Sequence, residues 1–365
     1  MYGLFRTTCR PAPSPKSPTG YVHRVINFAP QPVGLPWPTI EWSTSAPAPD
    51  VDVEAATAAL RAIRETPVDD GVALATLVIH GGRIVFEQYG ADTDLNTTLL
   101  SWIMAKSITH ALFGLLVGDG LIDIDDPAPV LEFAGTDKAS ITTRDLLAMK
   151  SGLEFVEDYE DEAVSHILAM FRAPDGDYAH YTASQRLEHE PGTVWNYSSG
   201  TTNILARIAG ELIGGGEQGM RTFLHDRLFG LLGMASAEPK FDGAGTFVGS
   251  SFVYATARDF ARFGYLYLRG GVWGDRQLLP LGWADYGRTE VAVDPDPPHF
   301  GYGAHWWIRR DQPGSIAAHG YDGQYIIVVP ARDLVVVQLS RVPAATRPAL
   351  LAKLDLLVNA FASSS

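Results

Sequence analysis

Apolar positions near the start of the chain recur at intervals of three or four residues, which predicts an amphipathic helix over 53–65. The positions are Val53, Ala56, Leu60 and Ile63. Two apolar runs follow at 72–79 and 84–89, and the pair Gly81-Gly82 lies between them. A glycine pair between two such runs is typical of a β-hairpin. The sequence therefore predicts a helix followed by a hairpin.

The same elements return in reverse order at the other end of the chain. Apolar runs at 325–329 and 334–339 flank a turn at 330–333, and a helical pattern over 347–362 follows. Matching hairpins at the two ends predict one antiparallel sheet built from both termini, with the first and last helices covering one face.

The middle of the chain, 99–245, shows mainly helical signals and no repeat of fixed period. Helices are expected over 106–119, 143–150, 163–171, 203–213 and 219–229. We therefore expect a sheet domain made of 53–98 and 246–365, with 99–245 inserted as a helical domain. Ligand sites favour such interfaces, so a cleft is expected between the two.

Residues 1–52 form a proline-rich segment, which hinders regular helix or sheet and predicts an extended arm. Its second half carries the aromatic side chains Tyr21, Phe28, Trp37 and Trp42. These favour an arm that wraps around the body over one that frays.

Composition and charge narrow the functional classes. The 365 residues are 46% hydrophobic and 19% charged, as in an ordinary globular protein, and the formal charge is −14. An acidic surface repels nucleic acid and anionic membranes, so the expected partner is a small molecule. The start lacks the apolar core of a signal peptide, and no apolar run approaches the roughly 18 residues of a membrane span, so we expect a cytoplasmic protein. Cys9 is the one cysteine, so no intramolecular disulfide is expected.

The first candidate for chemistry is the segment Ser101-Trp102-Ile103-Met104-Ala105-Lys106-Ser107 at a helix start. Residues three apart share one helical face, so the side chain at 103 and the amine of Lys106 would be neighbours. A lysine in an apolar site can lose its proton and activate a neighbouring hydroxyl, but Ile103 has none. The alternative is a surface lysine on an amphipathic helix.

The second candidate is the segment 191–199, Pro-Gly-Thr-Val-Trp-Asn-Tyr-Ser-Ser, which precedes a helix. A tyrosine beside a cationic lysine can be stabilised as phenolate or can pass a proton, so Tyr197 suits a general acid/base role. The alternative is a tyrosine packed at a domain edge after a Pro-Gly turn.

The third candidate is 317–325, which contains Ala318-His319-Gly320-Tyr321 and leads into an apolar strand. Glycine lets the backbone approach a ligand closely. The N–H of Tyr321, together with the N–H of Ile103, could point at a developing oxyanion. The alternative is an ordinary glycine-rich turn before a strand.

In this order and at these separations, the three segments resemble the serine β-lactamase-like, penicillin-recognising family over roughly 66–362. They are most similar to its class C β-lactamase, esterase and 6-aminohexanoate-oligomer hydrolase members. Three further stretches look like the same family: 149–153, 255–264 and 302–307. The resemblance implies an α/β (α+β) β-lactamase-like fold and a hydrolase of amides or esters that needs neither metal nor organic cofactor.

The resemblance also implies roles for individual residues. Lys106 matches the family's general base, Tyr197 its tyrosine, and Ala318-His319-Gly320 its third box, with the N–H groups of Ile103 and Tyr321 as the oxyanion hole. The residues expected to bind substrate are Ser199, His319, Gly320, Tyr159 and Trp306. Two of these carry alternatives from the sequence: Tyr159 lies in the acidic run 157–162, most simply a solvated loop, and Trp306, like Trp307, suits the core as well as the pocket.

Three positions depart from the family pattern. Ile103 replaces the serine nucleophile, Ser199 stands where β-lactamases usually have asparagine, and Ala318 stands where they usually have lysine. The last two favour an ester or amide hydrolase over a β-lactamase, and the first predicts severe loss of acyl-enzyme chemistry. Substitute nucleophiles are not expected from Ser101, Ser107, Ser198 or Ser199. The alternative functions are a non-catalytic binding protein that uses the same cleft, and a β-lactamase.

Overall fold

The structure, a computed structural model, describes residues 28–296 and 298–362. The expectations for Cys9 and Tyr21 fall on residues outside this part. Within it, a large antiparallel sheet has the strand order β2-β1-β13-β12-β11-β10-β9-β8. The strands are β1 (Val72–His80), β2 (Arg83–Tyr89), β8 (Ala292–Val293), β9 (Gly301–Tyr302), β10 (Trp307–Ile308), β11 (Ile316–Gly320), β12 (Gln324–Val329) and β13 (Leu334–Arg341).

The two predicted hairpins lie side by side and form one half of this sheet, β2-β1-β13-β12. β1 pairs with β13 in antiparallel register, with Leu77 opposite Val337, so the first and last parts of the chain are joined by backbone hydrogen bonds. The prediction of one antiparallel sheet built from both ends is confirmed.

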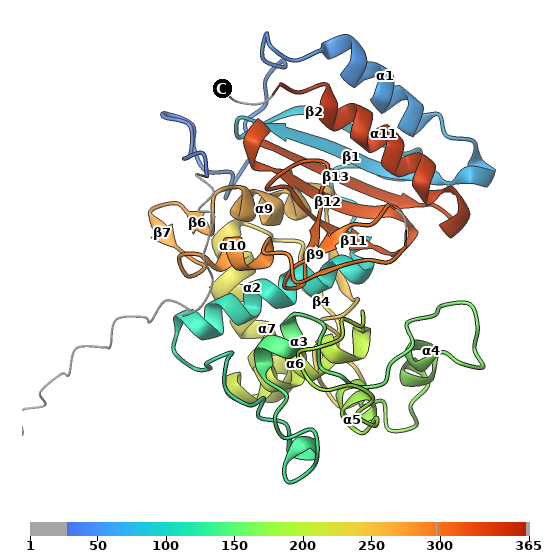
Figure 1. Cartoon of the computed structure of the whole chain (residues 1–365). Helices are drawn as coiled ribbons and strands as arrows, with labels where there is room; N and C mark the ends of the chain where they lie inside the picture. The colour runs from blue at the N-terminus through green and yellow to red at the C-terminus, as the bar shows by residue number, and fades with distance from the viewer. Residues whose placement is uncertain (1–27, 297, 363–365) are drawn as a thin grey trace, which may run out of the picture.

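Helices α1 (Val53–Arg64) and α11 (Arg347–Asn359) lie side by side on one face of the sheet (Figure 1). Asp52 caps α1, its side chain accepting a hydrogen bond from the Ala55 N–H at 2.9 Å. Apolar side chains of both helices pack with every second residue of β12 and β13 in one core cluster. The terminal helices thus cover one face, as the sequence predicts.

The opposite face is covered by α9 (Ala257–Leu268), beyond which lies α2 (Ala105–Gly118). α9 approaches the strands closely: a Cβ at Gly264 would lie 2.7 Å from Ile326 Cγ2 and 2.8 Å from Val335 Cγ1. Its polar residues Asp259 and Arg262 are buried as an ion pair at 2.6 Å. α9 was not among the predicted helices, although nearly all of its residues are buried.

The inserted part is mainly helical and lies below the sheet in Figure 1. Its helices are α3 (Thr143–Leu147), α4 (His166–Phe171), α5 (Tyr178–Ala183), α6 (Ser199–Ile213), α7 (Gly216–Leu224) and α8 (Gly230–Leu232), with a π-helical turn at His225–Phe229. α10 (Trp283–Gly287) follows α9. In a small sheet, β5 (Val253–Ala255) lies between β3 (Leu99–Leu100) and β4 (Glu238–Pro239), while β6 (Val272–Trp273) pairs with β7 (Arg276–Gln277).

The described part of the arm, 28–52, packs against the body. Trp42 is buried and its indole N–H donates to the carbonyl oxygen of Arg258 at 3.2 Å. The Trp37 ring lies 5.1 Å from that of Trp273. The prediction that the second half of the arm wraps the body is confirmed for these residues. In the part of the chain described, every helix is too short or too polar to cross a bilayer.

Candidate active site

Position 103 lies in a one-turn 3₁₀ helix, Trp102–Met104, that leads directly into α2. Trp102 has a φ of 45°, in the left-handed region that a bulky residue rarely adopts. Such a backbone persists only when the surrounding structure holds it, and the Trp102 ring packs 6.0 Å from Phe252 and 5.7 Å from Tyr321. The half-buried Ile103 side chain lines a cavity of about 760 Å³.

Lys106 lies on the first turn of α2 and is 2% exposed. Its Nζ donates to Ser199 Oγ at 2.8 Å and to the Ser250 carbonyl oxygen at 3.2 Å, and it lies 4.9 Å from the centre of the Tyr197 ring. Burial lowers the pKa of Lys106 to about 8, against the opposing charge of Glu157. A buried amine with this pKa can serve as a general base near neutral pH.

Tyr197 lines the same cavity, on the segment that precedes α6. Ser198 caps that helix, its Oγ accepting from the Thr201 N–H at 2.9 Å, which fixes the chain next to Tyr197. Burial raises the pKa of Tyr197 well above its ordinary value. The side chain is therefore a neutral phenol at neutral pH, which suits a proton donor better than the phenolate considered from the sequence.

Ser199 connects Lys106 to Glu157. The sequence analysis assigned Glu157 to a solvated loop. The Glu157 carboxylate accepts hydrogen bonds from Ser199 Oγ and, at 2.7 Å, from the Ser199 N–H. It also accepts from Tyr159 Oη at 2.8 Å. A second bond, from Asn196 Nδ2 to the Phe155 carbonyl oxygen at 3.0 Å, ties the same two loops together.

Glu157 is thus the residue that sequence reasoning missed. Nothing in the run 157–162 distinguishes it from exposed neighbours such as Glu160. Its position two residues before Tyr159, which was a candidate, was the one available signal. Tyr159 itself packs on Tyr321 with ring centres 4.9 Å apart, and it does not line the 760 Å³ cavity.

Gly320 and Tyr321 close the other side of the site. A Cβ at Gly320 would lie 2.5 Å from the Ser101 carbonyl oxygen, so glycine is needed for the end of β11 to approach the 3₁₀ turn. This close contact brings together the two segments that carry the N–H groups of Ile103 and Tyr321, as an oxyanion hole requires.

His319 lines the cavity within an aromatic cluster. Its ring stacks on Trp307 at 5.3 Å and meets the edges of Phe300 at 4.8 Å and Tyr325 at 5.0 Å. Burial, together with the nearby Arg309 charge, lowers the pKa of His319 to about 3, so the imidazole is neutral. It supplies shape and polarity to the cavity and no positive charge.

The positive charge available in the cavity comes from Arg347 at the start of α11, another residue that the sequence analysis did not single out. Its guanidinium lies 4.8 Å from the centre of the Tyr321 ring. Among the described residues no ion pair is formed by Arg347, and its Nε has no hydrogen-bond partner. The other lining arginines are paired: Arg309 with Asp355, and Arg310 with Glu290 at 3.1 Å.

The serines considered as substitute nucleophiles are all engaged in structural hydrogen bonds. Ser101 Oγ donates to backbone carbonyl oxygens and accepts from the Val253 N–H, and Ser107 Oγ donates to the His305 carbonyl oxygen at 2.8 Å. Ser198 caps α6, and Ser199 is fully buried between Lys106 and Glu157. None of the four lines the 760 Å³ cavity.

Trp306 requires a correction. Its side chain is fully buried, parallel to Phe263 with ring centres 6.1 Å apart and 4.5 Å from Tyr267, and it does not line the cavity. The next residue, Trp307, is the first of β10 and forms part of the cavity wall. Trp306 is a core residue.

We expect Trp306→Ala to lower the free energy of unfolding by about 3–5 kcal/mol, the usual cost of removing a large buried aromatic side chain. Trp307→Ala should cost clearly less, because Trp307 is partly exposed at the cavity wall. Urea unfolding followed by circular dichroism measures both values. A larger loss for Trp307→Ala than for Trp306→Ala would contradict this assignment.

The chain is similar to several known proteins. A family model described as beta-lactamase matches residues 61–360. The chain is 28% identical over 288 residues to the 6-aminohexanoate-dimer hydrolase of Paenarthrobacter ureafaciens, covering 74% of this chain and 72% of that protein.

Solved structures share the fold. One is a Bacillus anthracis protein assigned as a 6-aminohexanoate-dimer hydrolase, with a TM-score of 0.72, 23% identity, and coverage of 87% of this chain and 86% of that one. Another is a family VIII carboxylesterase, with a TM-score of 0.63, 14% identity, and coverage of 87% and 99%. At these identities the likeness establishes the fold alone.

Proposed function

The chain belongs to the beta-lactamase family. On that premise we propose that it has the active site of a hydrolase that acts on a small amide or ester, and that Ile103 occupies the position of the nucleophile. The observation that carries this proposal is the preserved proton-transfer machinery. Lys106 is buried with its pKa lowered to about 8, and it lies against the Tyr197 ring beside the cavity that Ile103 lines. These groups suit acyl transfer to a hydroxyl at position 103, which this chain lacks.

In the proposed reaction, neutral Lys106 takes the proton from a nucleophile at position 103, and Tyr197 passes a proton to the leaving group. The N–H groups of residue 103 and Tyr321 stabilise the tetrahedral oxyanion. With isoleucine at 103 the first step has no nucleophile, so activity of this chain should be severely impaired. Comparing the chain with its Ile103→Ser form on a short-chain ester and on the linear 6-aminohexanoate dimer tests the proposal.

We further propose that the substrate carries a carboxylate. Among the described residues Arg347 forms no ion pair within 4 Å, while His319 is neutral and Ala318 has no charge, so Arg347 is the group that would bind an anion in the cavity that Ile103 lines. The relative's name, 6-aminohexanoate-dimer hydrolase, describes a substrate with such a carboxylate. β-Lactam turnover is less favoured, since lysine is absent from position 318.

In the Ile103→Ser background, Arg347→Gln should reduce kcat/KM about ten- to a hundredfold for an ester with a terminal carboxylate, the usual range for loss of a charged hydrogen bond. An uncharged ester of equal length should be affected much less. Initial rates with the two esters give the ratio. An equal loss for both esters would show that Arg347 only supports the fold.

Glu157 should set the pH at which Lys106 becomes neutral. Its negative charge raises the pKa of Lys106, so Glu157→Gln in the Ile103→Ser background should move the midpoint of the pH–rate profile downward by about one unit. Glu160→Gln, an exposed change in the same loop, is the matched control. An unchanged midpoint for Glu157→Gln would show that this carboxylate does not act on Lys106.

The second candidate function is a non-catalytic binding protein that holds an uncleaved amide or ester in the same cavity. Ile103 itself is the observation that favours it, because an apolar side chain replaces a reactive one at the cavity wall. Tight binding of an intact amide by the unaltered chain, together with an inert Ile103→Ser form, would support this function over the hydrolase.

A further inference from the structure

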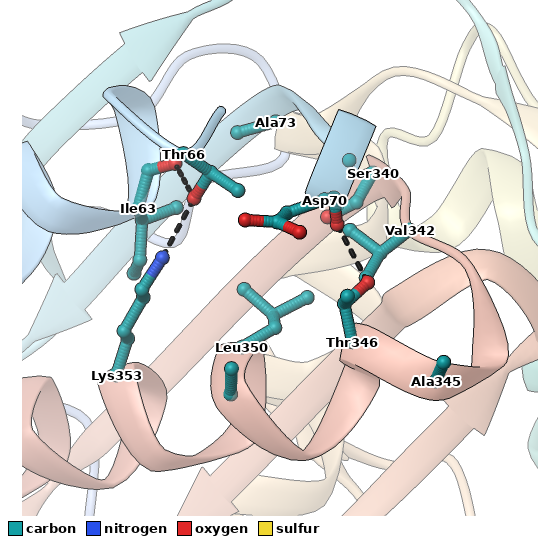
Figure 2. A pocket seen from close by; sticks show the side chains of 12 residues that line it. Ile63, Thr66, Asp70, Ala73, Ser340, Val342, Ala345, Thr346, Leu350 and Lys353 are labelled. Carbon is teal, nitrogen blue, oxygen red and sulfur yellow. Dashed lines mark hydrogen bonds between the residues drawn. The ribbon is translucent and has the colours of Figure 1, made fainter. Parts of the chain in front are cut away.

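A second cavity, of about 230 Å³, lies on the outer side of the sheet, between the end of α1, the start of β1 and the first turns of α11 (Figure 2). Its apolar lining includes Ile63, Val342 and Leu350. Two opposite charges line it as well: Lys353 from α11, and Asp70 from the turn before β1. None of the residues assigned to the proposed reaction lines this second cavity.

The two charges are not paired with each other or with another described residue. Lys353 Nζ donates one hydrogen bond, to Thr66 Oγ1 at 2.7 Å, so two of its three N–H donors remain for a ligand. No described group bonds to the Asp70 carboxylate, while its backbone oxygen is held by Thr346 Oγ1 at 2.6 Å. Figure 2 shows both charged groups pointing into the same space, with Leu350 on the α11 side.

We propose that this cavity binds a small zwitterion, a molecule whose ammonium and carboxylate groups are joined by a short apolar chain. The carboxylate pairs with Lys353, the ammonium with Asp70, and the chain lies over Ile63 and Leu350. A simple anion would be repelled by Asp70 and a simple cation by Lys353, so the site discriminates against ligands with one charge. The volume equals that of about eight waters, which suits a linear amino acid of four or five carbons.

This site is independent of the proposed hydrolase function. Lys353 and Arg347 are six positions apart on α11, which places them about 120° apart around the helix. Lys353 faces the small cavity and Arg347 the large one. A zwitterion bound in the large cavity would therefore depend on Arg347, whereas one bound in the small cavity would depend on Lys353 and Asp70.

The test is calorimetric titration of the whole chain with 4-aminobutyrate, compared with butylamine and butyrate, each of which carries one of the two charges. We expect 4-aminobutyrate to bind at least about tenfold more tightly than either control. Absence of binding at millimolar concentration, or equally tight binding of butylamine or butyrate, would overturn the proposal.

Variants then locate the site. Asp70→Asn and Lys353→Met should each weaken binding about tenfold or more, whereas Asp69→Asn and Lys240→Met, which remove like charges outside the cavity, should leave it unchanged. Arg347→Gln should also leave it unchanged. Asp70 is exposed, so Asp70→Asn should fold normally, as thermal melting will verify. Binding that is insensitive to Asp70→Asn and Lys353→Met, or that is lost in Arg347→Gln, overturns the proposal.

Discussion

The Ile103→Ser variant is expected to form an acyl-enzyme with a short-chain nitrophenyl ester and to turn it over at least about a thousandfold faster than the unaltered chain. The loss of an activated nucleophile typically costs several powers of ten in rate, and restoring it in an intact site should regain much of this. The site meets that condition, because Lys106 and Tyr197 already lie together beside the cavity. Initial rates measure turnover, and intact-protein mass spectrometry detects the acyl adduct.

Ile103→Ala is the matched control, since it opens the same space without supplying a hydroxyl. It should stay as slow as the unaltered chain and give no adduct. Equal activity of the alanine and serine variants would place the nucleophile elsewhere. If all three forms fold and none reacts with ester or amide, the binding-protein function becomes the better account of the cavity.

The sheet was predictable because its central strands come from short apolar runs with clear turns between them. Within each hairpin, 72–89 and 325–339, the two strands are adjacent in sequence, so the hydrophobic pattern and the turn between the strands were sufficient. The short strands β8, β9 and β10 at one end of the sheet have two residues each and carry too few positions for any periodicity. They form because the aromatic residues between 300 and 307 pack against β11, a long-range cause that local patterns do not contain.

The site residues also differ in whether local sequence patterns could identify them. The catalytic candidates Lys106 and Tyr197 were found because helical spacing and motif order place them, and the structure brings the Lys106 amine against the ring of Tyr197, which lines the cavity. Glu157 and Arg347 were not found, because each is one charged residue among many and its role comes from a distant partner. Glu157 meets Ser199 across 42 positions, and Arg347 meets the Tyr321 ring from the start of another element.

The Trp306 error has a related cause. Trp306 and Trp307 are adjacent where β10 begins, and the sequence does not say which of the two enters the core. The register of β10 against β11, with Trp307 opposite Ala317, decides it. Residues whose function depends on strand register are therefore the ones that a local motif assigns least securely.

The rate of the Ile103→Ser variant is expected to rise with pH and to level off above about pH 8. Lys106→Met in the same background should remove nearly all of the activity that Ile103→Ser gains. Burial lowers the pKa of Lys106 from 10.5 to about 8, and only the neutral amine can accept the proton of the nucleophile. Below pH 8 the neutral fraction falls about tenfold per unit, so the rate should fall in proportion. Initial rates between pH 6 and pH 10 measure the profile.

The controls separate this base from general effects of pH. Lys150→Met removes a lysine outside both cavities and should leave the midpoint and the plateau unchanged. Glu157→Gln should lower the midpoint and keep the shape of the profile, because it acts on the same amine. A profile that stays flat from pH 6 to pH 10, or one that keeps its midpoint and most of its rate in the Lys106→Met variant, would show that another group activates the serine. The lowered pKa of Lys106 would then reflect burial alone, without a part in proton transfer.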